Sequence, residues 1–127
     1  MGEIYTFVTV TSFADPSKTI KCQALIDTGA SYLTLPDPWK DQLGKLDLLE
    51  AVEVETATQE KIQGEVRGPV KIQLEGFRPI ASEVLFIDMK PSDGNYEPLV
   101  GHLVLEQAGI AIDLISHRLM KGRALLK

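Results

Sequence analysis

Cysteine and histidine are scarce in this chain of 127 residues, which has one cysteine, Cys22, and two histidines, His102 and His117. A single cysteine excludes a disulfide within the chain and is typical of a reducing compartment, so we expect a cytoplasmic protein. The histidines do not stand at helical spacing from each other, and no cysteine pair accompanies them. Metal sites need several such ligands close together, so no metal ion is expected.

Basic runs and long apolar runs are also missing. Lys and Arg together number 13 against 18 Asp and Glu, which gives a net charge of -5 at pH 7. Such a chain has neither the basic surface of a nucleic-acid-binding protein nor a polybasic membrane patch. No segment is apolar for long enough to cross a bilayer, and the first residues do not form a signal peptide. We therefore expect no nucleic-acid partner and no membrane partner.

The size and composition are those of an ordinary soluble protein. The chain is 44% hydrophobic and 24% charged, and a chain of this length can bury about two thirds of its unfolded surface. Neither a repeat of short period nor a low-complexity tract divides it. We therefore predict a single domain over residues 1–127.

Alternating apolar and β-branched residues predict strands over most of the chain. A short helix is expected at 38–43, where Asp37 is a good N-cap and Gly44 a good C-terminal cap, and another after Gly101, closed by Gly109. Many strands against two short helices indicate an all-β barrel or sandwich. The expected strands cover residues 4–10, 19–26, 32–35, 70–74, 80–87, 99–100, 110–115 and 118–120, with a hairpin at 52–66.

Residues 24–31, Ala-Leu-Ile-Asp-Thr-Gly-Ala-Ser, are the part of the chain that most needs explanation. Their apolar beginning predicts a buried strand, and the small residues after Asp27 predict a tight loop. Asp27 is therefore expected at the rim of the core. Carboxylates are costly to desolvate, so they seldom occupy such places without a partner or a task.

Other chemistry has less support in the sequence. Ser31 would need a base to act as a nucleophile, and no nucleophile-elbow pattern surrounds it. Cys22 alternates with Lys21 and Gln23 toward the core face of its strand, which predicts a small structural hydrophobe rather than a reactive thiol. The glycines are scattered singly, without a phosphate-binding loop, so no cofactor is expected. Carboxylate chemistry at Asp27 remains.

The Leu-Ile-Asp-Thr-Gly-Ala-Ser run at 25–31 resembles the active-site motif of the retropepsin-like aspartic proteases. It follows a buried-type strand at the end of a hairpin, and the polar-tipped hairpin at 52–66 occupies the place of the family's flap. Leu99, Val100 and Gly101 resemble the second signature, which opens a short helix. The resemblance extends from residue 4 to about 120 and is greatest to small cellular members, including bacterial ones. It implies a closed six-stranded barrel with a flap hairpin and one or two short helices.

The resemblance also implies a mechanism and a homodimer. Peptide hydrolysis without a covalent intermediate uses two carboxyl groups that share one proton, one acting on water and the other on the scissile carbonyl. The chain has one Asp-Thr-Gly, so an Asp27 from each of two subunits would meet on a two-fold axis, braced by Thr28 and Gly29. The implied substrate is a peptide or protein. Its implied contacts are Ala30, Ser31, Thr56, Ala57, Thr58, Gln59, Leu99, Val100 and Gly101.

The chain departs from the family pattern at several positions. The flap tip at 57–60 has no glycine, and Leu103 stands where the family often has Asn or Asp. Ser31 and Tyr32 replace the acidic residues of viral members. Two alternatives to an active protease follow: an inactive peptide-binding or dimerisation scaffold of the same fold, and an unrelated soluble β domain in which Asp27 caps a turn.

Overall fold

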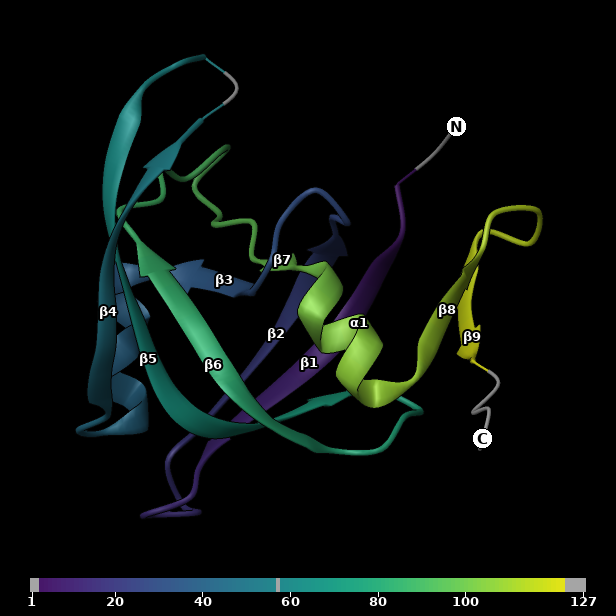
Figure 1. Cartoon of the computed structure of the whole chain (residues 1–127), viewed down its shortest axis with the longest axis horizontal. Coiled ribbons are helices and arrows are strands. Elements are labelled where there is room, and N and C mark those ends of the chain that lie inside the picture. Colours follow the sequence, from purple (N-terminus) through teal and green to yellow (C-terminus); the bar gives the residue numbers. More distant parts are fainter. Residues whose placement is uncertain (1–2, 57, 123–127) are drawn as a thin grey trace.

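The computed structural model describes residues 3–56 and 58–122, which fold mainly into strands (Figure 1). No helix in these ranges is long and apolar enough to span a membrane. The elements in chain order are β1 (Tyr5–Ser12), β2 (Thr19–Ile26), β3 (Leu33–Pro36), the 3₁₀ helix η1 (Asp37–Leu43), β4 (Asp47–Glu55), β5 (Lys61–Leu74), β6 (Ile80–Ile87), β7 (Leu99–Val100), α1 (His102–Ala108), β8 (Ile110–Asp113) and β9 (Arg118–Lys121).

The strand pairings close into a ring. The sheet order is β1-β2-β7-β3-β6-β5-β4, and β1 also pairs with β5, so the ring contains six strands and β4 lies outside it on β5. β2 and β7 run parallel, as do β3 and β6, while the β1–β2, β4–β5 and β5–β6 pairs are antiparallel. The all-β class predicted from the alternation is confirmed.

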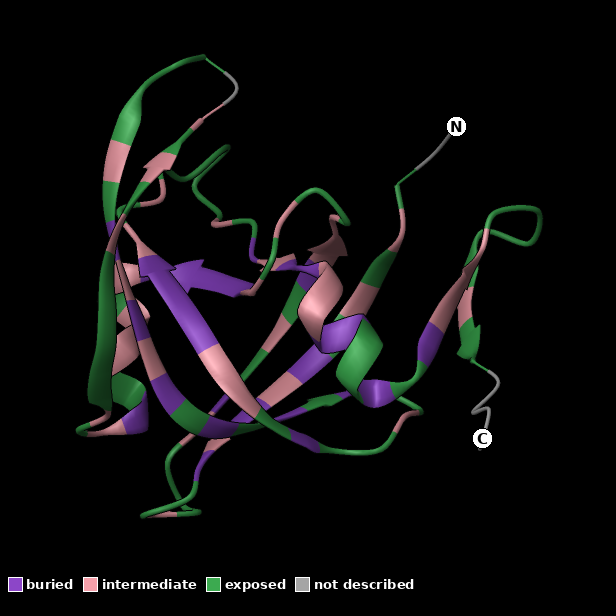
Figure 2. Ribbon diagram, viewed as in Figure 1, coloured by how far each residue is buried: buried purple, intermediate pink, exposed green. Residues whose placement is uncertain are grey.

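Apolar side chains at alternate strand positions fill the interior of the ring, and buried residues alternate with more exposed ones along several strands (Figure 2). On β5, Val70, Ile72 and Leu74 are buried while the residues between them are exposed, because successive side chains of a strand point to opposite faces. β3 is buried along its whole length. The largest fully buried side chains are Phe86, Leu33, Leu35, Leu43, Ile72 and Leu74.

The structure corrects two local predictions. A break was expected at residues 67–69, yet β5 runs unbroken from Lys61 to Leu74. Its pairing with β6 shifts register between Arg67 and Val70, so a bulge accommodates Pro69, which has no N–H to donate. Asp37 was expected as the N-cap of a helix, but it lies inside η1 after the N-cap Pro36.

Cys22 lies on β2, partly buried against the core. Burial disfavours the thiolate and raises the pKa of the Cys22 thiol to about 11. Because the thiolate is the reactive form, iodoacetamide at pH 8 should modify folded Cys22 at least about tenfold more slowly than the denatured chain. Mass spectrometry over time measures both rates, and equal rates would contradict the inward position of the thiol.

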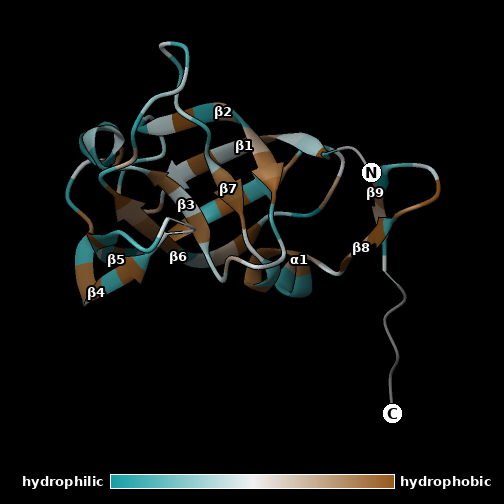
Figure 3. Cartoon of the chain, turned by 90° about the horizontal axis from the view of Figure 1, so that it is seen from above, coloured by the Kyte–Doolittle hydropathy of each residue, from teal (hydrophilic) through white to brown (hydrophobic). Residues whose placement is uncertain are grey.

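The end of the chain forms a second, smaller sheet. β8 and β9 pair with each other in an antiparallel hairpin, from Ile110 opposite Lys121 to Asp113 opposite Arg118. This two-stranded sheet is separate from the ring, and it projects from the body beyond α1 in both views (Figures 1 and 3). A predicted strand at 110–115 therefore ends two residues early, where the hairpin turn begins.

Candidate active site

Asp27 lies directly after the last residue of β2, as the sequence predicts. β2 pairs in parallel with β7, Leu25 opposite Leu99 and Ile26 opposite Val100. The Asp27 N–H continues this pairing by donating to the Val100 carbonyl at 3.0 Å. Asp27 is half-buried, so its carboxyl group lies at the rim of the core with one side open.

The loop after Asp27 holds the carboxylate in place. The Gly29 N–H donates to Asp27 Oδ1 at 3.0 Å, and the Ala30 N–H donates to the Asp27 carbonyl at 3.0 Å. A Cβ at position 29 would lie 3.2 Å from Asp27 Oδ1, so a larger residue there would require the carboxylate to shift by a few tenths of an ångström. Thr28, between them, is exposed. The loop therefore orients one carboxylate oxygen through a backbone N–H.

The segment at the start of α1 packs closely against this loop, backbone to backbone. The Gly101, His102 and Leu103 N–H groups donate at 2.9–3.0 Å to the carbonyls of Tyr32, Ala30 and Ser31 respectively. These are donors of a first helical turn, which have no partner within the helix. Leu103 docks through its backbone, so the Asn or Asp that the family often has there is not needed for these contacts.

Gly101 is required by the same close packing. A Cβ at position 101 would lie 2.4 Å from the Ser31 carbonyl carbon and 2.6 Å from the Tyr32 oxygen. Both neighbours are backbone atoms, which cannot rotate away. The structure thus brings together Asp27, the loop after it and the Leu99–Gly101 segment, which the sequence singles out separately.

A cavity of about 340 Å³ opens beside Asp27. Its wall includes Ile112 and Leu114 of the β8–β9 hairpin, neither of which the sequence indicates as a site residue. Long-range packing of the chain end creates this wall, and no local motif indicates it. The lining residues are Glu3, Ile4, Leu25, Ile26, Asp27, Thr28, Ile112 and Leu114.

The tip of the β4–β5 hairpin is a polar turn. Thr56 Oγ1 lies 3.0 Å from Thr58 Oγ1 and accepts from the Glu60 N–H at 3.2 Å. Gln59 has a φ of 66°, so it takes the left-handed conformation that a glycine usually supplies. Ala57 lies outside the described residues. Within the described ranges, no hydrogen bond links this tip to Asp27.

Charged side chains join β5, away from the hairpin tip, to η1. Lys40 Nζ lies 3.0 Å from Asp37 Oδ1 and 3.1 Å from Glu65 Oε1, and Arg67 Nε lies 3.0 Å from the same Glu65 oxygen. Hydrogen bonds from Arg67 and then Lys40 lower the pKa of the Glu65 carboxyl group. The network was not foreseen from the sequence, since it joins two segments of the chain that lie 25 residues apart at Lys40 and Glu65.

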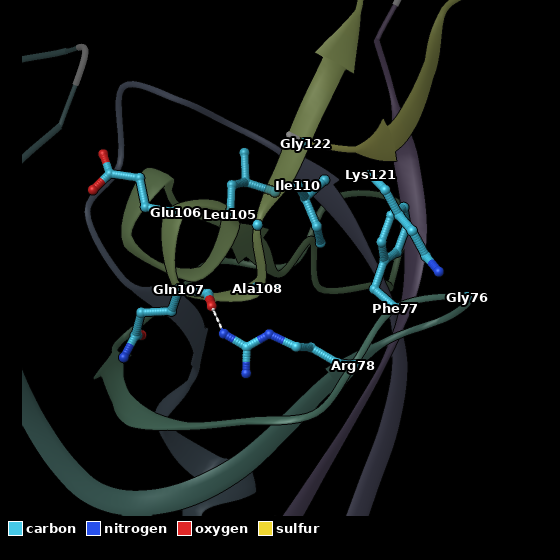
Figure 4. Close-up of a pocket in the computed structure, with 11 residues that line it drawn as sticks. Gly76, Phe77, Arg78, Leu105, Glu106, Gln107, Ala108, Ile110, Lys121 and Gly122 are labelled. Atoms are coloured by element: carbon cyan, nitrogen blue, oxygen red, sulfur yellow. Dashed lines mark hydrogen bonds between the residues drawn. The ribbon is translucent and has the colours of Figure 1, made fainter. Parts of the chain in front are cut away.

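A second cavity, of about 900 Å³, lies between the β5–β6 turn and the end of α1 (Figure 4). Arg78 crosses it and donates to the Gln107 carbonyl. None of its lining residues belongs to the Asp27 loop, so cavity size alone does not locate the site. Across the described part of the chain, no three His, Cys, Asp or Glu side chains are grouped to hold a metal ion.

Three features together define a retropepsin-like aspartic protease fold. They are a closed ring of strands, an Asp-Thr-Gly loop at the end of a strand, and the Leu99–Gly101 segment, whose glycine packs against that loop. The family model of aspartyl proteases matches residues 13–101, most of the chain. The chain belongs to the aspartyl protease family. This excludes the alternative of an unrelated β domain.

A solved structure shows the same fold. The EIAV protease complexed with the inhibitor HBY-793 superposes with a TM-score of 0.63, at 19% sequence identity, over 89% of this chain and 94% of that one. No curated protein matches the sequence. The family match ends at Gly101, before α1 and the β8–β9 hairpin.

Proposed function

We propose that this chain is an aspartic endopeptidase whose active site forms between two copies. The observation that carries the proposal is the position of Asp27, half-buried at a strand end with one oxygen oriented by the Gly29 N–H at 3.0 Å. One chain contains one such loop. A carboxyl pair therefore needs a second copy, placed by a two-fold axis beside Asp27.

In the proposed reaction, the carboxylate of one Asp27 takes a proton from water, and the water oxygen bonds to the scissile carbonyl carbon. The protonated Asp27 of the other copy donates to the carbonyl oxygen. As the C–N bond of the tetrahedral intermediate breaks, one of its hydroxyl groups returns a proton to the ionised Asp27, and the amine leaves with the proton of the other Asp27, so the pair again shares one proton. Like charges at such short separation cannot both ionise, which is why the pair shares one proton.

The neighbouring residues take supporting roles in this proposal. Thr28 is exposed next to Asp27 and would hydrogen-bond across the axis. Ala30, Ser31 and the Leu99–Gly101 segment would border an extended peptide held by backbone hydrogen bonds. The hairpin tip, Thr56, Ala57, Thr58 and Gln59, would close over it as a flap. A cytoplasmic peptide or protein is the proposed substrate.

The test is cleavage of a peptide library at mildly acidic and neutral pH over a range of protein concentrations. We expect cleavage, with specific activity that rises with concentration because only dimers contain a complete site. Absence of cleavage at concentrations where the protein is dimeric would contradict the proposal.

An inactive peptide-binding scaffold is the second candidate. The hairpin tip favours it, since its turn relies on Gln59 in the left-handed conformation rather than on a glycine, which restricts how such a lid can move. Library peptides that bind in fluorescence polarisation but remain intact after long incubation would support the scaffold.

A further inference from the structure

The cavity of about 900 Å³ between the β5–β6 turn and the end of α1 is a candidate binding site away from Asp27. Its volume lies within the range of cavities that bind small molecules, roughly 300–1,000 Å³. The proposed protease reaction uses none of its lining residues, so the cavity calls for a separate explanation.

The floor of this cavity is apolar. Leu105, Ala108 and Ile110 line it and are buried in the core, and the half-buried Phe77 adds an aromatic ring from the β5–β6 turn. Apolar surface that faces a cavity gains free energy when an apolar group covers it. The floor therefore favours a ligand with an apolar body.

Two cationic side chains reach the same cavity from distant parts of the chain. Arg78 precedes β6 and Lys121 ends β9, and among the described residues neither takes part in an ion pair. Arg78 donates to the Gln107 carbonyl (Figure 4), a neutral acceptor that engages only part of a guanidinium with five N–H groups. Positive charge and free donors remain for a ligand.

The one acidic residue of the lining does not compensate this charge. The carboxylate of Glu106 is turned away from Arg78 in the close-up view (Figure 4). Its Oε1 lies 3.2 Å from Nδ1 of His102, one helical turn earlier. The side of the cavity that holds Arg78 and Lys121 is therefore suited to an anion.

Hydrogen bonds fix two walls of the cavity. In the β5–β6 turn, the Phe77 N–H donates to the Leu74 carbonyl at 3.0 Å, and Gln73 Nε2 donates to the Phe77 carbonyl at 2.9 Å. On the other side, the Gly122 N–H donates to the Gly109 carbonyl at 2.6 Å. Walls that are ordered in advance lower the entropic cost of binding.

We infer that this cavity binds an organic carboxylate with an apolar body. The carboxylate would lie on the Arg78 guanidinium, whose planar fork matches two carboxylate oxygens, with Lys121 as a second cation. The apolar body would cover Leu105, Ala108 and Ile110. A free carboxylic acid and the carboxyl end of a peptide share this chemistry.

The first test titrates the protein with hexanoate and follows the backbone amide signals by NMR. We expect shifts at Phe77, Arg78 and Ile110, and affinity at least about tenfold above that of hexanol, which lacks the charge, and of acetate, which lacks the apolar body. Shifts confined to other residues, or equal affinity for hexanol, would overturn the site.

A peptide arm of the same experiment separates the two sources of carboxylate. Acetyl-Ala-Ala-Leu and its amide are titrated into the Asp27→Asn variant, which prevents cleavage. Tighter binding of the acid than of hexanoate at the same amides would assign the site to a peptide end, and weaker binding would assign it to a free acid. Equal binding of acid and amide at these amides would contradict the carboxylate contact.

The second test replaces Arg78. Arg78→Gln should weaken hexanoate binding about tenfold or more, and Arg78→Lys should weaken it less, because the charge remains while the fork is lost. Arg118→Gln is the matched control, since its side chain is 70% exposed on β9 and does not line the cavity. Thermal unfolding checks that all variants fold. Unchanged affinity in a folded Arg78→Gln protein would overturn the inference.

The outcomes are independent of the proposed function. Asp27→Asn should bind hexanoate as the wild type does, because Asp27 lies outside the cavity. A protein that cleaves peptides but shows no hexanoate shifts would overturn this inference alone. A protein that binds hexanoate through Arg78 but cleaves no peptide would support the site and contradict the protease.

Discussion

Replacing Asp27 by Asn is expected to lower kcat for peptide cleavage by about 1,000-fold or more, because an amide can neither accept a proton from water nor donate one to the carbonyl oxygen. The shape of the side chain is retained, and its oxygen can still accept from the Gly29 N–H, 3.0 Å from Oδ1 in the wild type. Stability and dimerisation should therefore change little. Steady-state kinetics on a peptide selected from the library measures the loss.

Asp88→Asn is the matched control for this substitution. Asp88 also follows a strand directly, since β6 ends at Ile87, but it is exposed and lacks a following Thr-Gly. We expect wild-type kcat from it. Cleavage that survives in Asp27→Asn, or that falls equally in Asp88→Asn, would place the reaction elsewhere.

Replacing Gly101 by Ala is expected to lower the free energy of unfolding by about 3 kcal/mol or more. This corresponds to a fall of roughly 10 °C in Tm. The new Cβ would lie 2.4 Å from the Ser31 carbonyl carbon. Relief requires the Asp27 loop and the start of α1 to separate, which breaks the backbone hydrogen bonds between them. Calorimetry or chemical denaturation measures the change.

Gly94→Ala separates this close approach from the general cost of losing a glycine. Gly94 has a φ of +78°, and a Cβ added there would have no neighbour within 4 Å, so alanine at this position should cost only about 1 kcal/mol. A Gly101→Ala protein as stable as Gly94→Ala would contradict the close packing at Ser31.

Much of the fold was predictable where the hydrophobic pattern and the residues that end strands and helices indicate the same boundaries. The bounds of β2 and β6 match the prediction, because β2 alternates, β6 ends in an apolar run, and loop-forming residues follow both strands. α1 was predicted because Gly101 and Gly109 stand at its two ends. The continuity of β5 through Pro69 was not, since a proline normally ends a strand and only its pairing with β6 shows the bulge.

The site was predictable only in part. The residues of the Asp27 loop and of the Leu99–Gly101 segment follow from motifs, and the structure places them in contact. The cavity wall made by Ile112 and Leu114 does not follow from any motif, because packing between distant parts of the chain creates it. The hairpin tip at 56–59 was expected to contact bound peptide, and this stays a prediction.

A subunit-mixing experiment tests the shared site most directly. Wild-type protein is held at a fixed concentration at which it is fully dimeric, a ninefold excess of Asp27→Asn is added, and subunits are left to exchange before peptide cleavage is measured. If each site needs an Asp27 from both copies, random pairing leaves about one tenth of the wild-type subunits in active dimers. Activity should then fall to about one tenth, whereas activity that stays at its starting value would show that one copy of Asp27 suffices.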